Sequence, residues 1–277
     1  MALAMATTTD HLTAVVSTWR QWHVTPPLAA PPIPGATFAE GSGHRLYALE
    51  NAPNLCVRLR HRATSTLAGG FTRETAVWSH AASHELAPWV AYVANKENAV
   101  VCERINSAHN TPTGEALGTL ARDIHQLPEI SYRLDLRQVI NDYLQRMPDD
   151  KRKQWQSVVA DPRTTRALLR LEQDEPRLCH NDLTPGNLLY RPDRWVAIDW
   201  EYAAMGSRYF DVAIAMPSLS KSSQHALLKT VFNGRADTEL LAAGQLTARL
   251  CTQLWQQCFD ADALIEPLRS PLKERAI

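Results

Sequence analysis

The 277-residue sequence predicts an α+β fold with a small β-rich N-terminal lobe and a larger, mostly helical C-terminal lobe. Up to about residue 104, short runs of alternating apolar and polar side chains dominate, which is the period of a β-strand. Beyond that point apolar residues repeat with the period of an α-helix. We therefore divide the chain into lobes 1–104 and 105–277, and a chain of this length can bury a sizeable core.

The N-terminal lobe is expected to begin with a helix that Asp10 caps and that continues to about Trp22. Five prolines between Thr25 and Gly35 then exclude a regular helix. A further helix is expected from Thr72 to about His84. The strand-like runs of this lobe are 36–40, 44–50, 54–60, 89–94 and 98–104.

The C-terminal lobe is expected to contain several helices around a short β insertion at about 177–199. Helices are expected to resume at about residue 208, and the last long one carries a leucine stripe with a period near 3.6 residues. The helical segments before the insertion are 113–126, 134–147, 150–160 and 163–173.

Composition excludes several classes of protein. With 29 basic and 29 acidic residues the net charge is zero, whereas a nucleic-acid or anionic-membrane binder usually shows a basic excess. No run of 18 apolar residues is present, so no membrane span is expected. The five cysteines have no CxxC spacing, which favours small buried side chains in a reducing compartment. We expect a cytoplasmic protein that is a monomer or a weak dimer.

One short stretch concentrates residues with catalytic chemistry. "HNDLTPGNLLY" (His180–Tyr190) places Asp182 five residues before Asn187, and Asp199 follows in "IDWEY" (Ile198–Tyr202). Phosphoryl transfer needs a carboxylate near the attacking hydroxyl and oxygen ligands for Mg²⁺. Each residue alone is typical of a turn. Their order, spacing and β context together favour catalysis.

With these motifs the chain resembles the aminoglycoside phosphotransferase and choline kinase superfamily, in particular its choline kinase and bacterial thiamine kinase branch. The resemblance implies a protein-kinase-like two-lobed fold with the nucleotide in the cleft, and ATP and Mg²⁺ as cofactors. It implies that Asp182 orients the acceptor hydroxyl and takes its proton, and that Asn187 and Asp199 bind Mg²⁺. In "YFDVA" (Tyr209–Ala213) it implies an Asp that orders the catalytic loop.

The resemblance also implies a phosphate-binding region in the N-terminal lobe. Gly41, Ser42 and Gly43 lie between two predicted strands and would cover the phosphates, although an ordinary hairpin turn is the alternative. No Lys precedes Lys96, so Arg58 is the candidate phosphate-binding cation, with Arg60 as the fallback on the same strand face. The alternative for Arg58 is a solvated strand face.

Glu74 is the candidate partner of the Arg58 guanidinium, and its alternative role is to interact with the helix dipole. Glu85 is a less suitable partner because it lies at the end of the helix. The strand around residues 99–105 resembles the hinge, so the backbone from Glu103 to Ile105 would bind adenine. His125, near the end of a predicted helix, is assigned no catalytic role.

The expected acceptor is a small cationic alcohol, with choline first and thiamine as the alternative. Aromatic faces and one or two acids would bind such a cation. The candidate acceptor-binding residues are Asp182, Trp200, Glu201 and Trp255, although core packing is the alternative for Trp255. Two further alternatives remain: an aminoglycoside phosphotransferase, and a non-catalytic nucleotide-binding pseudokinase.

Overall fold

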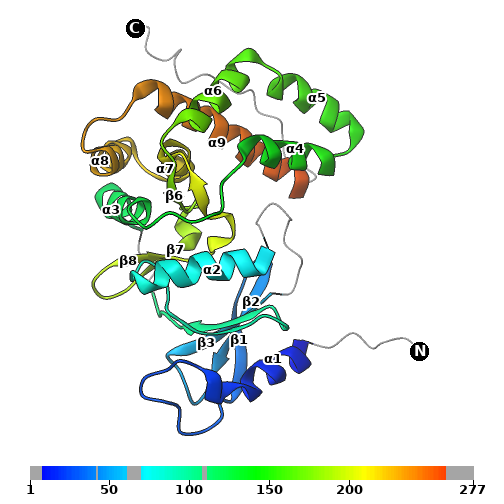
Figure 1. The fold of residues 1–277 in the computed structure, drawn as a ribbon, viewed down its shortest axis with the longest axis vertical. Helices are drawn as coiled ribbons and strands as arrows, with labels where there is room; N and C mark the ends of the chain where they lie inside the picture. Colours follow the sequence, from blue (N-terminus) through cyan, green and yellow to red (C-terminus); the bar gives the residue numbers. More distant parts are fainter. Residues whose placement is uncertain (1–7, 42, 61–69, 108–110, 260–277) are drawn as a thin grey trace. The chain divides into compact units, whose positions relative to one another are not determined.

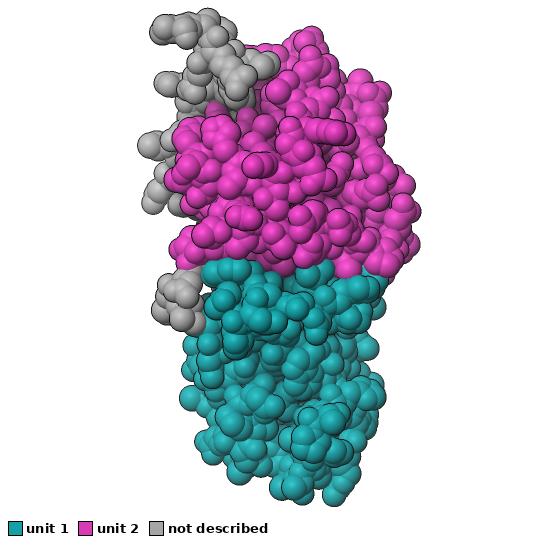
Figure 2. Space-filling model, turned by 90° about the vertical axis from the view of Figure 1, so that its left-hand side faces the viewer, with its two compact units in different colours: residues 1–110, 189–201 teal, residues 111–188, 202–277 magenta. Residues whose placement is uncertain are grey.

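The computed structural model describes residues 8–41, 43–60, 70–107 and 111–259 (Figure 1). The chain forms two compact units, coloured separately in Figure 2. The first unit comprises Met1–Asn110 together with Leu189–Glu201, and the second comprises Thr111–Leu188 together with Tyr202–Ile277. The predicted β insertion is thus divided, and its residues from 189 onward pack with the N-terminal part of the chain.

An antiparallel five-stranded sheet forms the centre of the first unit (Figure 1). Its strand order is β1-β2-β3-β5-β4, so β3 and β5 are interior strands and β4 is an edge strand. All five predicted strands are present, with ends shifted by two residues or fewer. Their bounds are β1 (Pro34–Glu40), β2 (His44–Leu49), β3 (Leu55–Arg60), β4 (Val90–Ala94) and β5 (Ala99–Glu103).

One face of this sheet is apolar and packs against the N-terminal segment. Val57 and Leu59 of β3 belong to a buried cluster that also includes Val15 of α1 (Thr8–Ser17) and Trp22. The helix begins before Asp10, so the prediction that Asp10 caps it is wrong. It also ends earlier than predicted, and a short 3₁₀ turn leads on to Trp22.

The opposite face of β3 presents Arg58, as the alternation predicts for a strand. Helix α2 (Gly70–Ser83) supplies Glu74 and Trp78 to this side, and the Arg58 guanidinium carbon lies 5.7 Å from the centre of the Trp78 ring. The alternative of a solvated strand face is wrong, because Arg58 is only 7% exposed.

The second unit is mainly helical, as predicted. A two-stranded sheet accompanies the helices, in which β6 (Arg177–Cys179) pairs with β9 (Ala204–Gly206). The other two-stranded sheet pairs β7 (Leu188–Tyr190) with β8 (Trp195–Ala197), and all of it except Leu188 belongs to the first unit. Strand β9 was not predicted. The helices are α3 (Gly114–His125), α4 (Leu136–Arg146), α5 (Asp149–Val159), α6 (Pro162–Gln173), α7 (Arg208–Ala215), α8 (Lys221–Phe232) and α9 (Thr238–Phe259).

Within the described residues, none of the helices combines the length and the apolar character needed to cross a membrane.

Helices α7 and α9 pack closely because Gly244 of α9 has no side chain. A Cβ atom at this position would lie 2.4 Å from the carbonyl oxygen of Tyr209. Real Cβ contacts are essentially never shorter than 3.0 Å, so a larger residue forces the two helices apart. Helix α7 carries the buried residue Asp211, so this packing also positions Asp211.

Gly244→Ala is therefore expected to lower the free energy of unfolding by about 1–3 kcal/mol, the usual cost of overpacking. Urea denaturation followed by circular dichroism measures the change. Thr252→Ala, at an exposed position of the same helix, is the control and is expected to stay within about 0.5 kcal/mol of wild type. Equal stability of the two variants would contradict the close packing described for Gly244.

Candidate functional site

Arg58 lies at the centre of a cluster of charged side chains in the first unit. Its Nη1 atom forms an ion pair with Glu74 Oε1 at 2.6 Å, and its Nη2 atom donates a hydrogen bond to Asp199 Oδ1 at 3.0 Å. Glu74 comes from α2 and is only 1% exposed, whereas Asp199 comes from the segment 189–201 and keeps 23% of its side chain exposed. Three segments distant in sequence therefore meet at one guanidinium.

Opposite charges offset part of the cost of burying this cluster. Burial alone would lower the pKa of Arg58, but the carboxylates of Glu74 and Asp199 outweigh it and the pKa lies above its ordinary value. Burial raises the pKa of Glu74, and the Arg58 charge offsets part of that rise. A buried charge of this kind is tolerated only when it is paired.

These contacts decide between Glu74 and Glu85 as the acidic partner, and between Arg58 and Arg60 as the cation. Glu85 is exposed and forms an ion pair with Arg194, so Glu74 is the partner of Arg58. Arg60 lies 4.0 Å from Glu201, which is a looser contact. Glu74 is also in the second turn of α2, away from the helix N-terminus, which excludes the helix-dipole role.

Asp199 has a backbone conformation that few non-glycine residues adopt. Its φ angle is +65°, in the left-handed region, where Asn and Asp are the most tolerated residues after glycine. Asn181 has the same property, with φ at +64°. The two acidic motifs of the sequence thus each contain one left-handed residue, as is common at functional sites.

The glycine turn connects β1 and β2, and the Gly41 N–H donates to the His44 carbonyl oxygen at 2.9 Å. Gly43 is buried, and Ser42 lies outside the described residues. The Gly41 N–H is therefore engaged in closing the turn. The phosphate-binding role of Gly41, Ser42 and Gly43 stays a prediction.

The predicted hinge lies at the end of β5. The Glu103 N–H donates to the carbonyl oxygen of Trp89, the residue before β4, and the Glu103 carboxylate pairs with Arg191. Ile105 follows this strand. The adenine-binding role of Glu103 and Ile105 stays a prediction.

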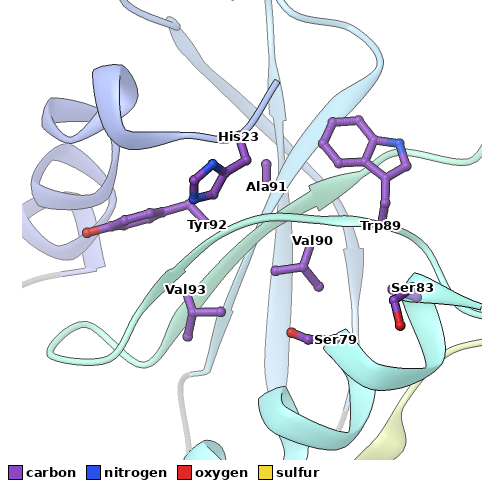
Figure 3. Close-up of a pocket in the computed structure, with 9 residues that line it drawn as sticks. His23, Ser79, Ser83, Trp89, Val90, Ala91, Tyr92 and Val93 are labelled. Carbon is purple, nitrogen blue, oxygen red and sulfur yellow. The ribbon is translucent and has the colours of Figure 1, made fainter. Parts of the chain in front are cut away.

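A separate open pocket of about 460 Å³ lies at the edge strand β4 (Figure 3). None of the predicted site residues lines it. Its lining residues come from β4, from α2 and from the segment before β1: His23, Ser79, Ala82, Ser83, Trp89, Val90, Ala91, Tyr92 and Val93.

In the second unit, the loop after β6 brings Asp182 and Asn187 together. The Asn187 side-chain nitrogen donates to the Asp182 carboxylate at 2.7 Å and to its backbone carbonyl at 3.0 Å. A 3₁₀ turn over Pro185–Asn187 produces this approach. Because the nitrogen of Asn187 is used in this way, its side-chain oxygen is the atom that can ligate a metal ion.

Asp211 at the start of α7 holds the beginning of this loop. Its Oδ1 atom accepts from the Asn181 backbone N–H at 2.6 Å, and its Oδ2 atom accepts from the His180 N–H at 3.3 Å. His125 Nε2 donates to the same carboxylate at 2.8 Å. Asp211 is fully buried and His125 is 3% exposed, so these contacts satisfy a carboxylate that water does not reach.

Sequence reasoning missed this contribution of His125. A signal was present, because His125 continues the face of α3 formed by the buried residues Leu117 and Ala121 at intervals of four. A polar residue on a buried face requires a buried partner, and Asp211 is that partner.

The two aromatic residues predicted to bind the acceptor, Trp200 and Trp255, differ in their exposure to solvent. Trp200 is fully buried, and its indole N–H donates to the Ala197 carbonyl at 3.0 Å, so it belongs to the packing of its own unit. Trp255 on α9 is 42% exposed, which does not fit the alternative of core packing. Glu201 is 9% exposed.

We expect Asp211→Asn to lower the free energy of unfolding by about 1–3 kcal/mol, since an amide nitrogen would then face buried N–H donors. Chemical denaturation with urea measures this loss. Asp150→Asn, an exposed position of α5, is the matched control and should leave stability unchanged. If both variants unfold at the same urea concentration, Asp211 does not hold the loop as described.

Comparison with known proteins shows the family of the chain. Residues 35–250 match the model of a phosphotransferase enzyme family. Protein LicA of Haemophilus influenzae is 46% identical over 59 residues, a match that covers 21% of this chain and only 22% of that protein.

Two solved structures are similar over almost the whole chain. One is choline kinase LicA from Streptococcus pneumoniae, with a TM-score of 0.67 and 15% identity, covering 94% of this chain and 93% of that one. The other is a choline/ethanolamine kinase family protein from Mesorhizobium loti, with a TM-score of 0.66 and 18% identity, covering 96% and 92%. At these identities the two structures establish the kinase-like fold.

Proposed function

Because the chain belongs to the phosphotransferase enzyme family, we propose that it is an ATP- and Mg²⁺-dependent kinase whose acceptor is a small cationic alcohol, choline first. The observation that carries the proposal is the buried Arg58 held between Glu74 and Asp199. A paired, fixed guanidinium is suited to bind phosphate oxygens, since its planar N–H groups match their geometry. Glu74 compensates the charge of Arg58 and fixes its orientation.

Asp182 is the proposed residue that orients the acceptor hydroxyl and accepts its proton. The Asn187 side-chain nitrogen, 2.7 Å from its carboxylate, holds Asp182 in one orientation. The contacts of Asp211 to the backbone at residues 180 and 181 fix the loop from the other side. A carboxylate held in this way can act without first reorganising.

The Asn187 side-chain oxygen and the Asp199 carboxylate are the proposed ligands of Mg²⁺. The donor set fits this ion, which prefers oxygen ligands and is bound in kinases by few protein groups. Asp199 suits the role because Glu74 already compensates the Arg58 charge, which leaves an excess of one negative charge in the cluster. When bound, Mg²⁺ offsets the negative charge of the transferred phosphate.

The acceptor is proposed from the names of similar proteins and from charge. Choline kinases are among the solved structures of similar fold, and Protein LicA is a curated relative over a short segment. Glu201 offers a carboxylate, and the exposed Trp255 offers an aromatic face, two groups that bind quaternary ammonium ions. Thiamine is the alternative acceptor, because it also joins a fixed positive charge to a primary alcohol.

We expect ADP release in a coupled assay with MgATP and choline, and little with ethanolamine, thiamine, a simple sugar or kanamycin. Turnover with thiamine or kanamycin alone would replace choline by that acceptor. MgATP binding without turnover on any of the five would favour a non-catalytic nucleotide-binding protein. Absence of both binding and turnover would overturn the kinase proposal.

Asp182→Ala is expected to lower kcat by at least about 100-fold, the low end for loss of a general base, while MgATP affinity stays near that of wild type. Steady-state kinetics and calorimetric titration with MgATP separate the two effects. Asp193→Ala removes an exposed carboxylate from the turn between β7 and β8 and should leave kcat unchanged. Retained turnover in the Asp182 variant would remove it from the mechanism.

A further inference from the structure

His44 is the first residue of β2 and directly follows the glycine turn. Its Nδ1 atom lies 3.1 Å from Nη2 of Arg58. A guanidinium has five N–H donors and no acceptor, so Nδ1 of His44 must be the accepting atom. His44 is therefore neutral in this contact and carries its proton on Nε2.

The register of the sheet produces this contact. His44 pairs with Arg60 across β2 and β3, and Leu46 pairs with Arg58. Side chains two residues apart on a strand share one face, so His44 and Arg58 are diagonal neighbours on the face that Arg58 presents to α2. Long side chains at diagonal positions can reach each other.

His44 differs in chemistry from the other two partners of Arg58. Glu74 and Asp199 both carry negative charge, whereas His44 accepts a hydrogen bond without compensating the charge of the guanidinium. It can thus fix the plane of Arg58 without adding a third negative charge to the cluster.

The same imidazole lies against the glycine turn. A Cβ atom added to Gly41 would lie 3.1 Å from both Cε1 and Nε2 of His44, closer than most real Cβ contacts. The His44 backbone carbonyl also accepts from the Gly41 N–H. His44 therefore contacts the turn with its backbone and ring, and Arg58 with Nδ1.

We propose that His44 is a positioning residue that couples the glycine turn to Arg58 and so sets the affinity for the nucleotide phosphates. The inference rests on the proposed nucleotide-dependent function. The anion whose binding this coupling supports is then a nucleoside triphosphate.

Calorimetric titration of MgATP into the full chain tests the proposal without an acceptor. His44→Leu removes the accepting atom at similar volume and is expected to weaken MgATP binding about tenfold, as for a lost hydrogen bond to a charged group. His44→Asn is expected to restore most of the affinity, because its side-chain oxygen can occupy the position of Nδ1. His84→Leu, an exposed histidine after α2, is the control and should bind MgATP as wild type does.

A double-mutant cycle shows whether His44 acts through Arg58. In an Arg58→Lys background, His44→Leu is expected to change MgATP affinity by less than about twofold, because the shared contact is already lost. Additive losses would overturn the proposal. If His44→Leu does not fold, as judged by circular dichroism, the His44→Gln variant is used in its place. The amide oxygen of Gln reaches the position of Nε2, so no acceptor remains at the position of Nδ1.

The outcomes separate this inference from the proposed function. Failure of the wild-type chain to bind MgATP would overturn both. Tight binding by wild type and equally tight binding by His44→Leu would overturn only the role of His44. An increase in the KM for MgATP with an unchanged KM for the acceptor would support it in steady-state assays.

Discussion

The first unit depends on a buried guanidinium that must be paired. Taking a charge out of water costs several kcal/mol unless opposite charges and hydrogen bonds compensate it. Arg58 is 7% exposed, and its compensation comes from a helix and from a segment far along the chain. This one side chain consequently links the sheet to α2 and to the segment 189–201. The proposed phosphate-binding chemistry uses the same arrangement.

Strand alternation was sufficient to predict much of this unit. Alternation along β3 places Val57 and Leu59 on one side of the sheet and Arg58 on the other, as the period of a strand requires. It could not predict that Arg58 is buried. Burial depends on α2 and on residues near 199, and local periodicity contains no information about either.

The second unit shows where local patterns are insufficient. The spacing of Asp182 and Asn187 indicated that the two side chains act together, and they are hydrogen-bonded. The period of α3 indicates that His125 needs a buried partner, but that partner, Asp211, is 86 positions away, so the local pattern cannot identify it. Strand β9 is three residues long and pairs with β6, which leaves too short a pattern to predict from sequence.

Because residues 189–201 belong to the first unit, this unit cannot be completed early in synthesis on the ribosome. Arg58 and Asp199 are 141 residues apart, and ribosomes add about 5–20 residues per second. Asp199 is therefore synthesised roughly 7–28 s after Arg58, whereas Glu74 follows Arg58 by only 16 residues. During this interval the first unit lacks β8, whose Ala197 N–H bonds to the Leu86 carbonyl. Neither unit can be produced as an uninterrupted fragment, and the N-terminal unit completes its folding only after most of the chain has left the ribosome.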